Sequence, residues 1–251
     1  MALRGFRTDI HRERKSDGTW VTEIDRAVES LLRRRIAESY PGHNILGEEE
    51  GLSAAGGGPA VDGAPVWVLD PIDGTNNFMS GIPIWATLVA LQIEGRNVLG
   101  VAHAARIDET YSARLGGGAF CNGEPISVSE NTNIAEAAVM FASVQSFQEN
   151  GLQDFFGRLM DQTWRSRGFG DFWGHMLVAR GAAHIAIEPQ LSIWDVAALE
   201  PIVSEAGGRL TTLDGAPFTH GQSVLTTNGF LHDQVLDLAR AHPASEDEAT
   251  D

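Results

Sequence analysis

Cysteine is almost absent from this sequence. Cys121 is the only one in 251 residues, so the chain can form no internal disulfide. A chain without disulfides fits the reducing environment of the cytoplasm. The eight histidines are scattered without a close pair, which excludes the ligand spacing of a zinc site. We therefore expect a cytoplasmic protein without a structural zinc ion.

Long hydrophobic runs are missing as well. The first residues, MALRGFRTDIHRER, are charged throughout and lack the apolar core of a secretory signal. The longest apolar stretch, IPIWATLVALQI, is interrupted by Thr87 and is too short to span a bilayer. Neither a secretory signal nor a transmembrane helix is expected.

Positive charge is scarce. The chain has 18 lysines and arginines against 34 aspartates and glutamates, which gives a formal net charge of -16 and a pI near 4.8. Such a chain repels the phosphates of nucleic acids and of anionic lipids, so we expect neither nucleic acid nor a membrane surface as a partner. Metal cations and cationic ligands suit it better.

The hydrophobic pattern predicts alternating helices and strands. Helical spacing or strand-like runs, bounded by Gly, Pro and Asn turns, predict helices at 24–36, 152–160, 172–180, 193–206 and 231–241, and strands at 66–69, 85–93, 97–105, 109–115, 163–167, 184–187, 210–213 and 224–227. The three strands from 85 to 115 should form an antiparallel meander, which a turn at 122–123 completes. Residues 51–65 are rich in glycine and alanine and indicate a mobile loop.

No short internal repeat is visible, so we expect one domain over residues 1–251. Its two halves, 1–135 and 136–241, should meet at a cleft. The last ten residues, 242–251, are acidic and are predicted to be disordered. Pro201 falls inside the predicted helix 193–206 and should kink it, although Asp195 precedes the kink.

Two acid-rich stretches end successive elements, GEEE at 47–50 and DPIDGT at 70–75. If Glu48, Asp70 and Asp73 converge, carboxylates about 4 Å apart repel each other by roughly 4 kcal/mol at an effective dielectric near 20. Such a cluster needs cations. Oxygen ligands without histidine or thiolate select Mg²⁺, Mn²⁺ or Ca²⁺, and the carbonyl of Ile72 can add a further oxygen.

Gly74 and Thr75 follow this cluster directly. If a helix begins there, their backbone amides lie free at its N-terminus and can bind a phosphate. The Thr75 hydroxyl can hydrogen-bond a metal-bound water, so that a Glu48–Thr75 pair orients and deprotonates the nucleophile. Two metal ions would lower the pKa of that water.

Each acidic candidate also has a structural explanation. Asp195 stands early in a predicted helix, where a lone aspartate is usually a cap. Asp25 completes a possible capping box with Thr22, so capping and outer metal ligation are equally open. The run at 47–50 alone would suit a solvated acidic turn.

Taken together, GEE at 47–49, DPIDGT at 70–75 and WDVAA at 194–198, followed by EAGG at 205–208, resemble the inositol monophosphatase superfamily in order and spacing. The resemblance covers nearly the whole chain. It implies an α+β fold, the layered αβαβα sandwich, with metal-dependent hydrolysis of a phosphate monoester, no covalent intermediate, and frequent homodimers.

The resemblance also implies roles for individual residues. It assigns the metal shell, for about two to three Mg²⁺ ions with Mn²⁺ as a substitute, to Glu48, Asp70, Asp73, Asp195 and the Ile72 carbonyl. It assigns water activation to Glu48 and Thr75, with Asp25 beside them, and phosphate binding to the amides of Gly74 and Thr75. One departure is the N-terminus, where only about ten residues precede the segment matching 15–25 instead of the complete helix usual in the family.

Within the superfamily, residues 163–199 are most similar to the bacterial histidinol-phosphate phosphatases. Gly170-Asp171-Phe172 and Glu188-Pro189-Gln190 carry this similarity. Asp171 and Glu188, with Asp195, could receive the ammonium and imidazole of histidinol phosphate. Alternatively, Asp171 caps the following helix and Glu188 has a structural role at a strand end. The aromatic residues Trp85, Phe169 and Trp173 could stack on the imidazole, although such residues are more often core.

The predicted function is hydrolysis of L-histidinol phosphate to L-histidinol in histidine biosynthesis by metal-activated water. Inositol monophosphates and a nucleotide 3′,5′-bisphosphate are alternative substrates. A non-catalytic relative that senses metal or acts as a scaffold would be expected to lose Glu48 or Thr75, and both are present. A calcium-binding structural module is disfavoured because no D-x-D-x-D-G loop occurs.

Overall fold

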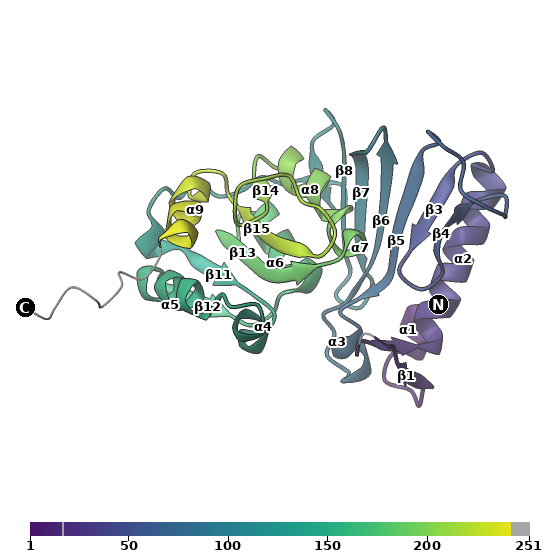
Figure 1. The fold of residues 1–251 in the computed structure, drawn as a ribbon, viewed down its shortest axis with the longest axis horizontal. Coiled ribbons are helices and arrows are strands. Elements are labelled where there is room, and N and C mark those ends of the chain that lie inside the picture. The colour runs from purple at the N-terminus through teal and green to yellow at the C-terminus, as the bar shows by residue number, and fades with distance from the viewer. Residues whose placement is uncertain (17, 242–251) are drawn as a thin grey trace, which may run out of the picture.

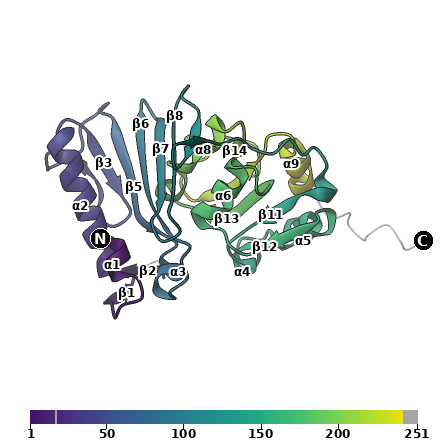
Figure 2. The ribbon, with the colours of Figure 1, turned by 180° about the vertical axis from the view of Figure 1, so that it is seen from behind.

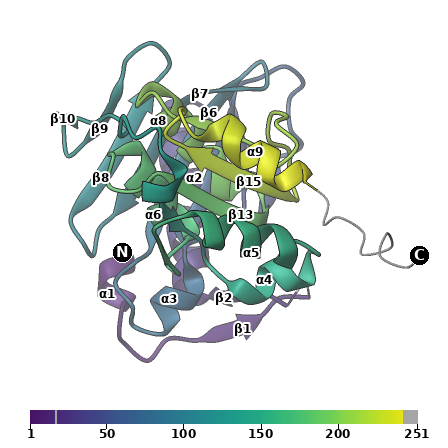
Figure 3. The ribbon, with the colours of Figure 1, turned by 90° about the vertical axis from the view of Figure 1, so that its left-hand side faces the viewer.

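The computed structural model describes residues 1–16 and 18–241 (Figure 1). The predicted acidic tail, 242–251, lies outside the described residues. Five layers follow one another across the molecule: helix α2, an eight-stranded sheet, helices α6 and α8, a five-stranded sheet, and helices α4, α5 and α9. Figure 3 views the stack from the side of α5 and α9. The expected αβαβα sandwich is confirmed.

The N-terminal segment is short but ordered. It contains helix α1 (Ala2–Gly5) and a two-stranded hairpin of β1 (Arg12–Arg14) and β2 (Trp20–Thr22). Helix α2 (Glu23–Ser39) begins at Thr22, whose hydroxyl accepts hydrogen bonds from two first-turn amides, and its buried residues include Val28 and Ile36. A four-residue α1 thus stands where relatives are expected to have a complete helix.

The eight-stranded sheet has the order β10-β9-β8-β7-β6-β5-β3-β4 and lies within residues 1–135 (Figure 2). Its strands are β3 (Asn44–Gly47), β4 (Gly51–Ala54), β5 (Val66–Asp73), β6 (Ala86–Ile93), β7 (Arg96–Ala104), β8 (Glu109–Arg114), β9 (Ala119–Cys121) and β10 (Glu124–Pro125). From β5 to β10 neighbouring strands pair antiparallel, so the predicted meander is confirmed.

Two expectations for this sheet were wrong in part. The predicted loop 51–65 begins with strand β4, which pairs antiparallel with β3 through small residues that carry little strand signal. The predicted strand 66–69 continues to Asp73, with an irregular register against β6 between Asp70 and Asp73. This irregularity changes the direction of the side chains just where the acidic motif lies.

The five-stranded sheet, with the order β12-β11-β13-β15-β14, lies within residues 136–241. The elements of this half are η1 (Ile134–Glu136), β11 (Ala138–Met140), α4 (Val144–Glu149), α5 (Gln153–Gln162), β12 (Arg165–Arg167), α6 (Asp171–Ala179), β13 (Ile185–Leu191), α7 (Ile193–Val196), α8 (Leu199–Glu205), β14 (Arg209–Thr211), β15 (Gln222–Thr227) and α9 (His232–Arg240). The sequence analysis did not predict strand β11 or helix α4, because each is too short to show a clear hydrophobic period.

The predicted helix 193–206 is interrupted at residues 197–198, which separates α7 from α8. Pro201 therefore lies in the first turn of α8, where its missing N–H costs no helical hydrogen bond. The interruption packs closely on β7: a Cβ on Gly100 would overlap the Ala198 carbonyl oxygen. The helix is therefore broken before Pro201 and not kinked at it, and Asp195 lies in the short helix before the break.

The main core lies between the two sheets. Bulky residues of α6 and α8, such as Phe172, Met176 and Ile202, pack on alanines of the meander, including Ala86 and Ala102. Small residues on the sheet let the two helices approach it closely. No helix in the described part of the chain is long and apolar enough to cross a membrane.

Candidate active site

A cleft of about 550 Å³ opens between the two halves. The loop of the β1–β2 hairpin, the end of β5, the start of α3 (Thr75–Met79), the start of α6 and the end of β13 with α7 all contribute to it. Its polar lining includes Lys15, Glu48, Asp70, Asp73, Thr75, Asn76, Asp171, Ser192 and Asp195. Most of the predicted site residues therefore meet in one place, although they come from both halves of the chain.

Three aspartates form the centre of the cleft. One carboxylate oxygen from each of Asp70, Asp73 and Asp195 lies within 4.8 Å of the others. The end of β5 supplies the first two, and the first turn of α7 supplies the third. Asp195 also caps its helix by accepting a hydrogen bond of 2.7 Å from the Ser192 amide, so the capping role and the cluster coexist in one residue.

The electrostatics of this cluster fit a cation. Burial, followed by the neighbouring Glu48 and Asp73 charges, raises the pKa of Asp70 well above its ordinary value. Burial raises the pKa of Asp195 to about 7. Asp70 Oδ1 is buried and has no hydrogen-bond partner among the described residues. A buried carboxylate oxygen that has no hydrogen-bond partner and lies among other carboxylates is suited to bind a hard divalent ion. The oxygen atoms of this cluster therefore fit Mg²⁺.

Glu48 is presented by a turn that a buried carboxylate supports. Glu29 of α2 is fully buried, and its oxygens accept hydrogen bonds from the amides of Glu49 (2.8 Å) and Glu50 (3.0 Å) and from Arg33 Nε (2.8 Å). A Cβ at Gly47 would collide with this carboxylate, which explains the glycine. Sequence reasoning missed Glu29; its only signal was a glutamate among the apolar positions of the amphipathic helix.

Lys15 is a second residue that sequence reasoning did not assign. Its Nζ donates to Glu48 Oε1 at 2.8 Å and to Glu49 Oε1 at 2.7 Å. Burial lowers the pKa of Lys15, but the hydrogen bonds to Glu48 and Glu49 outweigh this effect and raise it to about 12. Lys15 therefore stays charged and offsets part of the negative charge at this end of the cleft.

Thr75 pairs with Asp25. The Thr75 hydroxyl lies 3.3 Å from Asp25 Oδ1 and 2.9 Å from the Ile72 carbonyl oxygen. Lys15 donates to Glu48, and no direct hydrogen bond joins Glu48 to Thr75 in the described residues; their predicted joint action on a water molecule needs no such bond and stays a prediction. Asp25 is fully buried and forms the capping box with Thr22 through its other oxygen, so it caps α2 and contacts Thr75 at the same time.

Gly74 and Thr75 begin α3, as expected. Gly74 has a φ of 84°, in the left-handed region that favours glycine. A Cβ there would stand 3.1 Å from the Ile84 carbonyl oxygen and 3.4 Å from Asp171 Oδ2. The first amides of a helix have no partner within that helix, so phosphate binding by the Gly74 and Thr75 amides stays a prediction with a suitable local geometry.

Asp171 and Glu188 are two further acidic residues near the cluster, and both come from the second half of the chain. Asp171 lines the cleft and does not cap α6, because Gly170 holds the cap position. Its Oδ2 accepts a hydrogen bond from Asn77 Nδ2 at 3.0 Å, and burial raises its pKa to about 6. Glu188 is buried and lies deeper, in β13, where burial and the nearby Asp171 charge raise its pKa well above the ordinary range.

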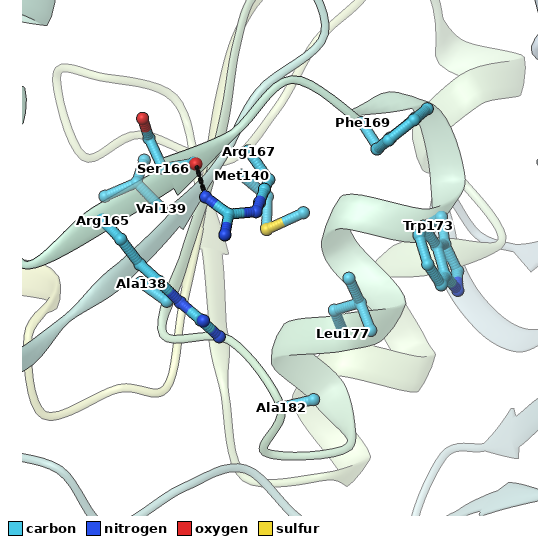
Figure 4. Close-up of a pocket in the computed structure, with 10 residues that line it drawn as sticks. All are labelled: Ala138, Val139, Met140, Arg165, Ser166, Arg167, Phe169, Trp173, Leu177 and Ala182. Atoms are coloured by element: carbon cyan, nitrogen blue, oxygen red, sulfur yellow. Dashed lines mark hydrogen bonds between the residues drawn. The ribbon is translucent and has the colours of Figure 1, made fainter.

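Three aromatic residues, Trp85, Phe169 and Trp173, were considered as stacking partners for a substrate ring at the acidic cluster. Trp85 is fully buried and packs edge-on against Phe78, as a core residue does. Phe169 and Trp173 line a separate groove of about 360 Å³ between β12 and α6, together with Arg165, Arg167 and Leu177 (Figure 4). None of the three lines the acidic cleft, so the idea that they stack on an imidazole there has no support from their positions.

Comparisons with known proteins agree with this geometry. The family model described as "Inositol monophosphatase family" matches residues 1–244. The chain is 44% identical to a histidinol-phosphatase of Mycobacterium tuberculosis over 91% of this chain and 87% of that protein. It is 32% identical to inositol monophosphatase 1 of Bos taurus, covering 94% of this chain and 87% of that protein. Among solved structures, an IMPase of Thermotoga maritima superposes with a TM-score of 0.82 at 32% identity, covering 94% of this chain and 89% of that one.

Proposed function

The chain belongs to the inositol monophosphatase family and is a phosphoric monoester hydrolase, and we propose that it converts L-histidinol phosphate to L-histidinol. The observation that carries this proposal is a second acidic group beside the aspartate cluster: Asp171 lines the same cleft, and Glu188 is buried close enough to Asp171 and Asp195 for their charges to raise its pKa. A cationic amino alcohol ester can place its phosphate at the cluster and its ammonium or imidazole at these acids. Relatives named histidinol-phosphatase, at 44% and 39% identity, support the same substrate.

Mg²⁺ is the proposed cofactor. Asp70, Asp73 and Asp195 would hold it together with Glu48 and the carbonyl of Ile72, because all five residues line the same cleft and supply only hard oxygen atoms. When bound, the metal would lower the pKa of a water molecule and neutralise charge on the phosphate. The orphaned oxygen of Asp70 and the raised carboxylate pKa values support this assignment.

The chain's own residues would handle the proton and the phosphate. Glu48 and Thr75 Oγ1 would orient an attacking water, and Asp25, 3.3 Å from the Thr75 hydroxyl, would accept the hydroxyl hydrogen. Burial raises the pKa of Asp25, so this carboxylate is a better proton acceptor than a solvated aspartate. The free amides at the start of α3 would orient the phosphate for in-line attack.

The pathway, the compartment and the oligomeric state are also proposals. We place the reaction in histidine biosynthesis in the cytoplasm, with the chain acting as a homodimer. Trp164 is 64% exposed and Phe169 is 43% exposed, both near edge strand β12, which supports a contact between copies. Light scattering at several protein concentrations tests the dimer directly.

The substrate is tested by measuring phosphate release with Mg²⁺ from histidinol phosphate, inositol 1-phosphate, fructose 1,6-bisphosphate and adenosine 3′,5′-bisphosphate, with a chelator control. We expect kcat/KM for histidinol phosphate to lead by about tenfold or more, or roughly 1.4 kcal/mol of transition-state preference. A lead for inositol 1-phosphate would replace the proposed substrate. No turnover of any ester with Mg²⁺ would support the non-catalytic alternative.

A further inference from the structure

Asn77 makes two side-chain hydrogen bonds, one within its own half of the molecule and one to the other half. Its Nδ2 donates to the Ile84 carbonyl oxygen at 2.9 Å and to Asp171 Oδ2 at 3.0 Å. Both hydrogens of the amide are therefore used. Asn77 belongs to α3, the helix that starts at the proposed phosphate site, whereas Asp171 belongs to α6. The Asn77 side chain thus links the helix at the proposed phosphate site to Asp171 in the other half of the molecule.

Asp171 needs such support because its backbone is unusual. Its φ is 48°, a left-handed conformation that non-glycine residues seldom adopt and that persists only when the surroundings hold it. The next amide, that of Phe172, donates to Asp73 Oδ2 at 2.7 Å, which fixes the chain on one side. The hydrogen bond from Asn77 and the close approach to Gly74 fix the carboxylate itself.

The remaining oxygen of Asp171 is the one that can meet a ligand. Within the described residues Oδ1 has no recorded hydrogen bond, and it is not among the buried atoms that lack a partner. Because Asp171 lines the cleft, Oδ1 is the oxygen open to it. The contact with Asn77 occupies Oδ2 and thereby sets the direction in which Oδ1 points.

We infer that Asn77 is a positioning residue that aims the Asp171 carboxylate at the substrate, and so tunes recognition of the substrate's cationic group. This inference rests on the proposed function for the choice of a cationic substrate. Asn77 acts through Asp171 and takes no part in the chemistry. Its loss should weaken substrate binding with little effect on the chemical step.

A double-mutant cycle tests this role, with Asn77→Ala, Asp171→Asn and the double variant. Asparagine tolerates a positive φ, so Asp171→Asn removes the charge while keeping the backbone. Asn77→Ala should raise KM for histidinol phosphate roughly tenfold, the loss typical of one hydrogen bond to a charged group, with kcat changed less than about twofold. KM for inositol 1-phosphate should change less. In the Asp171→Asn background, Asn77→Ala should have no further effect on KM.

Asn97→Ala is the matched control. Asn97 also bridges two elements, because its Nδ2 donates to Glu200 Oε2 at 3.1 Å between β7 and α8, away from the cleft. A comparable loss of thermal stability without a change in KM is expected for it. Additive effects of Asn77→Ala and Asp171→Asn, or a fall in kcat for every ester at unchanged KM, would overturn the inference.

The cycle also separates this inference from the choice of substrate. If the wild-type protein prefers inositol 1-phosphate, the proposed substrate fails, but the coupling between Asn77 and Asp171 is then measured on that ester. Asp171 lines the cleft for either ester. Coupled KM effects would uphold the role of Asn77, and independent effects would reject it.

Discussion

The carboxylate of Asp73 accepts a hydrogen bond of 2.7 Å from the backbone amide of Phe172, 99 residues further along the chain. One oxygen of this aspartate is thereby held by the first turn of α6, and the carboxylate also offers an oxygen within 4.8 Å of oxygens of Asp70 and Asp195. The positive end of a helix stabilises a carboxylate that burial would otherwise protonate. The same contact places Asp171 beside the cluster, so the proposed metal ligands and the proposed substrate ligand share one hydrogen-bonded support.

Asp73→Asn keeps the shape of the side chain and the acceptor for the Phe172 amide but removes the charge. We expect turnover at saturating Mg²⁺ to fall by more than roughly 100-fold, because a ligand is lost and the cluster binds metal weakly. The circular dichroism spectrum and the unfolding midpoint should be close to those of the wild type. Asp161→Asn, at an exposed aspartate of α5, is the matched control and should leave activity unchanged. Retained turnover in Asp73→Asn would contradict its role as a ligand.

The metal-free protein should be less stable at pH 8 than at pH 5. Burial raises the pKa of Asp195 from 3.8 to about 7 and that of Asp171 to about 6. A carboxylate whose pKa is raised in the folded state contributes stability that is present below the unfolded pKa and is lost as the pH rises through about 6 to 7. Burial lowers the pKa of His175 and His232 to about 4, which acts in the opposite direction up to about pH 6.5. Burial also raises the pKa of Asp70, Asp73 and Glu188, so we expect the loss with rising pH to be the larger effect. Thermal unfolding with a chelator from pH 5 to pH 8 measures this loss, and Mg²⁺ should restore the midpoint at pH 8. A midpoint that climbs with pH in the chelator would refute the argument.

Glu188→Gln should raise KM for a cationic ester more than for a neutral one. The Glu188 pKa is raised well above the ordinary range by burial, so the group ionises favourably only when a cation approaches it. Removing this charge should cost the cationic substrate roughly tenfold in kcat/KM and the neutral ester little. Steady-state kinetics with histidinol phosphate and inositol 1-phosphate give both numbers. Equal effects on the two esters would exclude Glu188 from substrate selection.

Gly100→Ala should destabilise the fold. The added Cβ would overlap the Ala198 carbonyl oxygen and stand 2.8 Å from Pro201 Cγ, so the α7–α8 break that follows Asp195 must shift. We expect a loss of roughly 1–3 kcal/mol in the free energy of unfolding, measured by urea denaturation, and reduced activity. Gly157→Ala in α5 is the control: nothing lies within 4 Å of its Cβ, so helix propensity should make it stabilising by up to about 1 kcal/mol. If Gly100→Ala left the free energy of unfolding unchanged, the packing of β7 on the α7–α8 break would not be as tight as we infer.

Local signals in the sequence were sufficient for most elements. The helical period from Ile24 to Ile36 and the meander from 85 to 115 were predicted within a few residues, because each shows several repeats of its own period. Short elements were predicted less evenly: strands β12, β14 and β15 were predicted, whereas β11 and α4 were missed. Their form comes from pairing with distant strands and packing on a core, which a short sequence window does not encode.

The sequence by itself determined the chemical identity of the candidate metal site, because Asp70, Ile72 and Asp73 are close in the chain and the motifs around Glu48 and Asp195 occur in recognisable order. Only the tertiary structure decided which partners those groups have. Thr75 meets Asp25 across 50 residues, Glu29 supports the turn of Glu48, and Asn77 reaches Asp171 across 94 residues. Sequence separation carries no information about distance once a chain folds back on itself. Hydrogen-bond partners that depend on the stacking of two sheets can therefore be read only from the folded molecule.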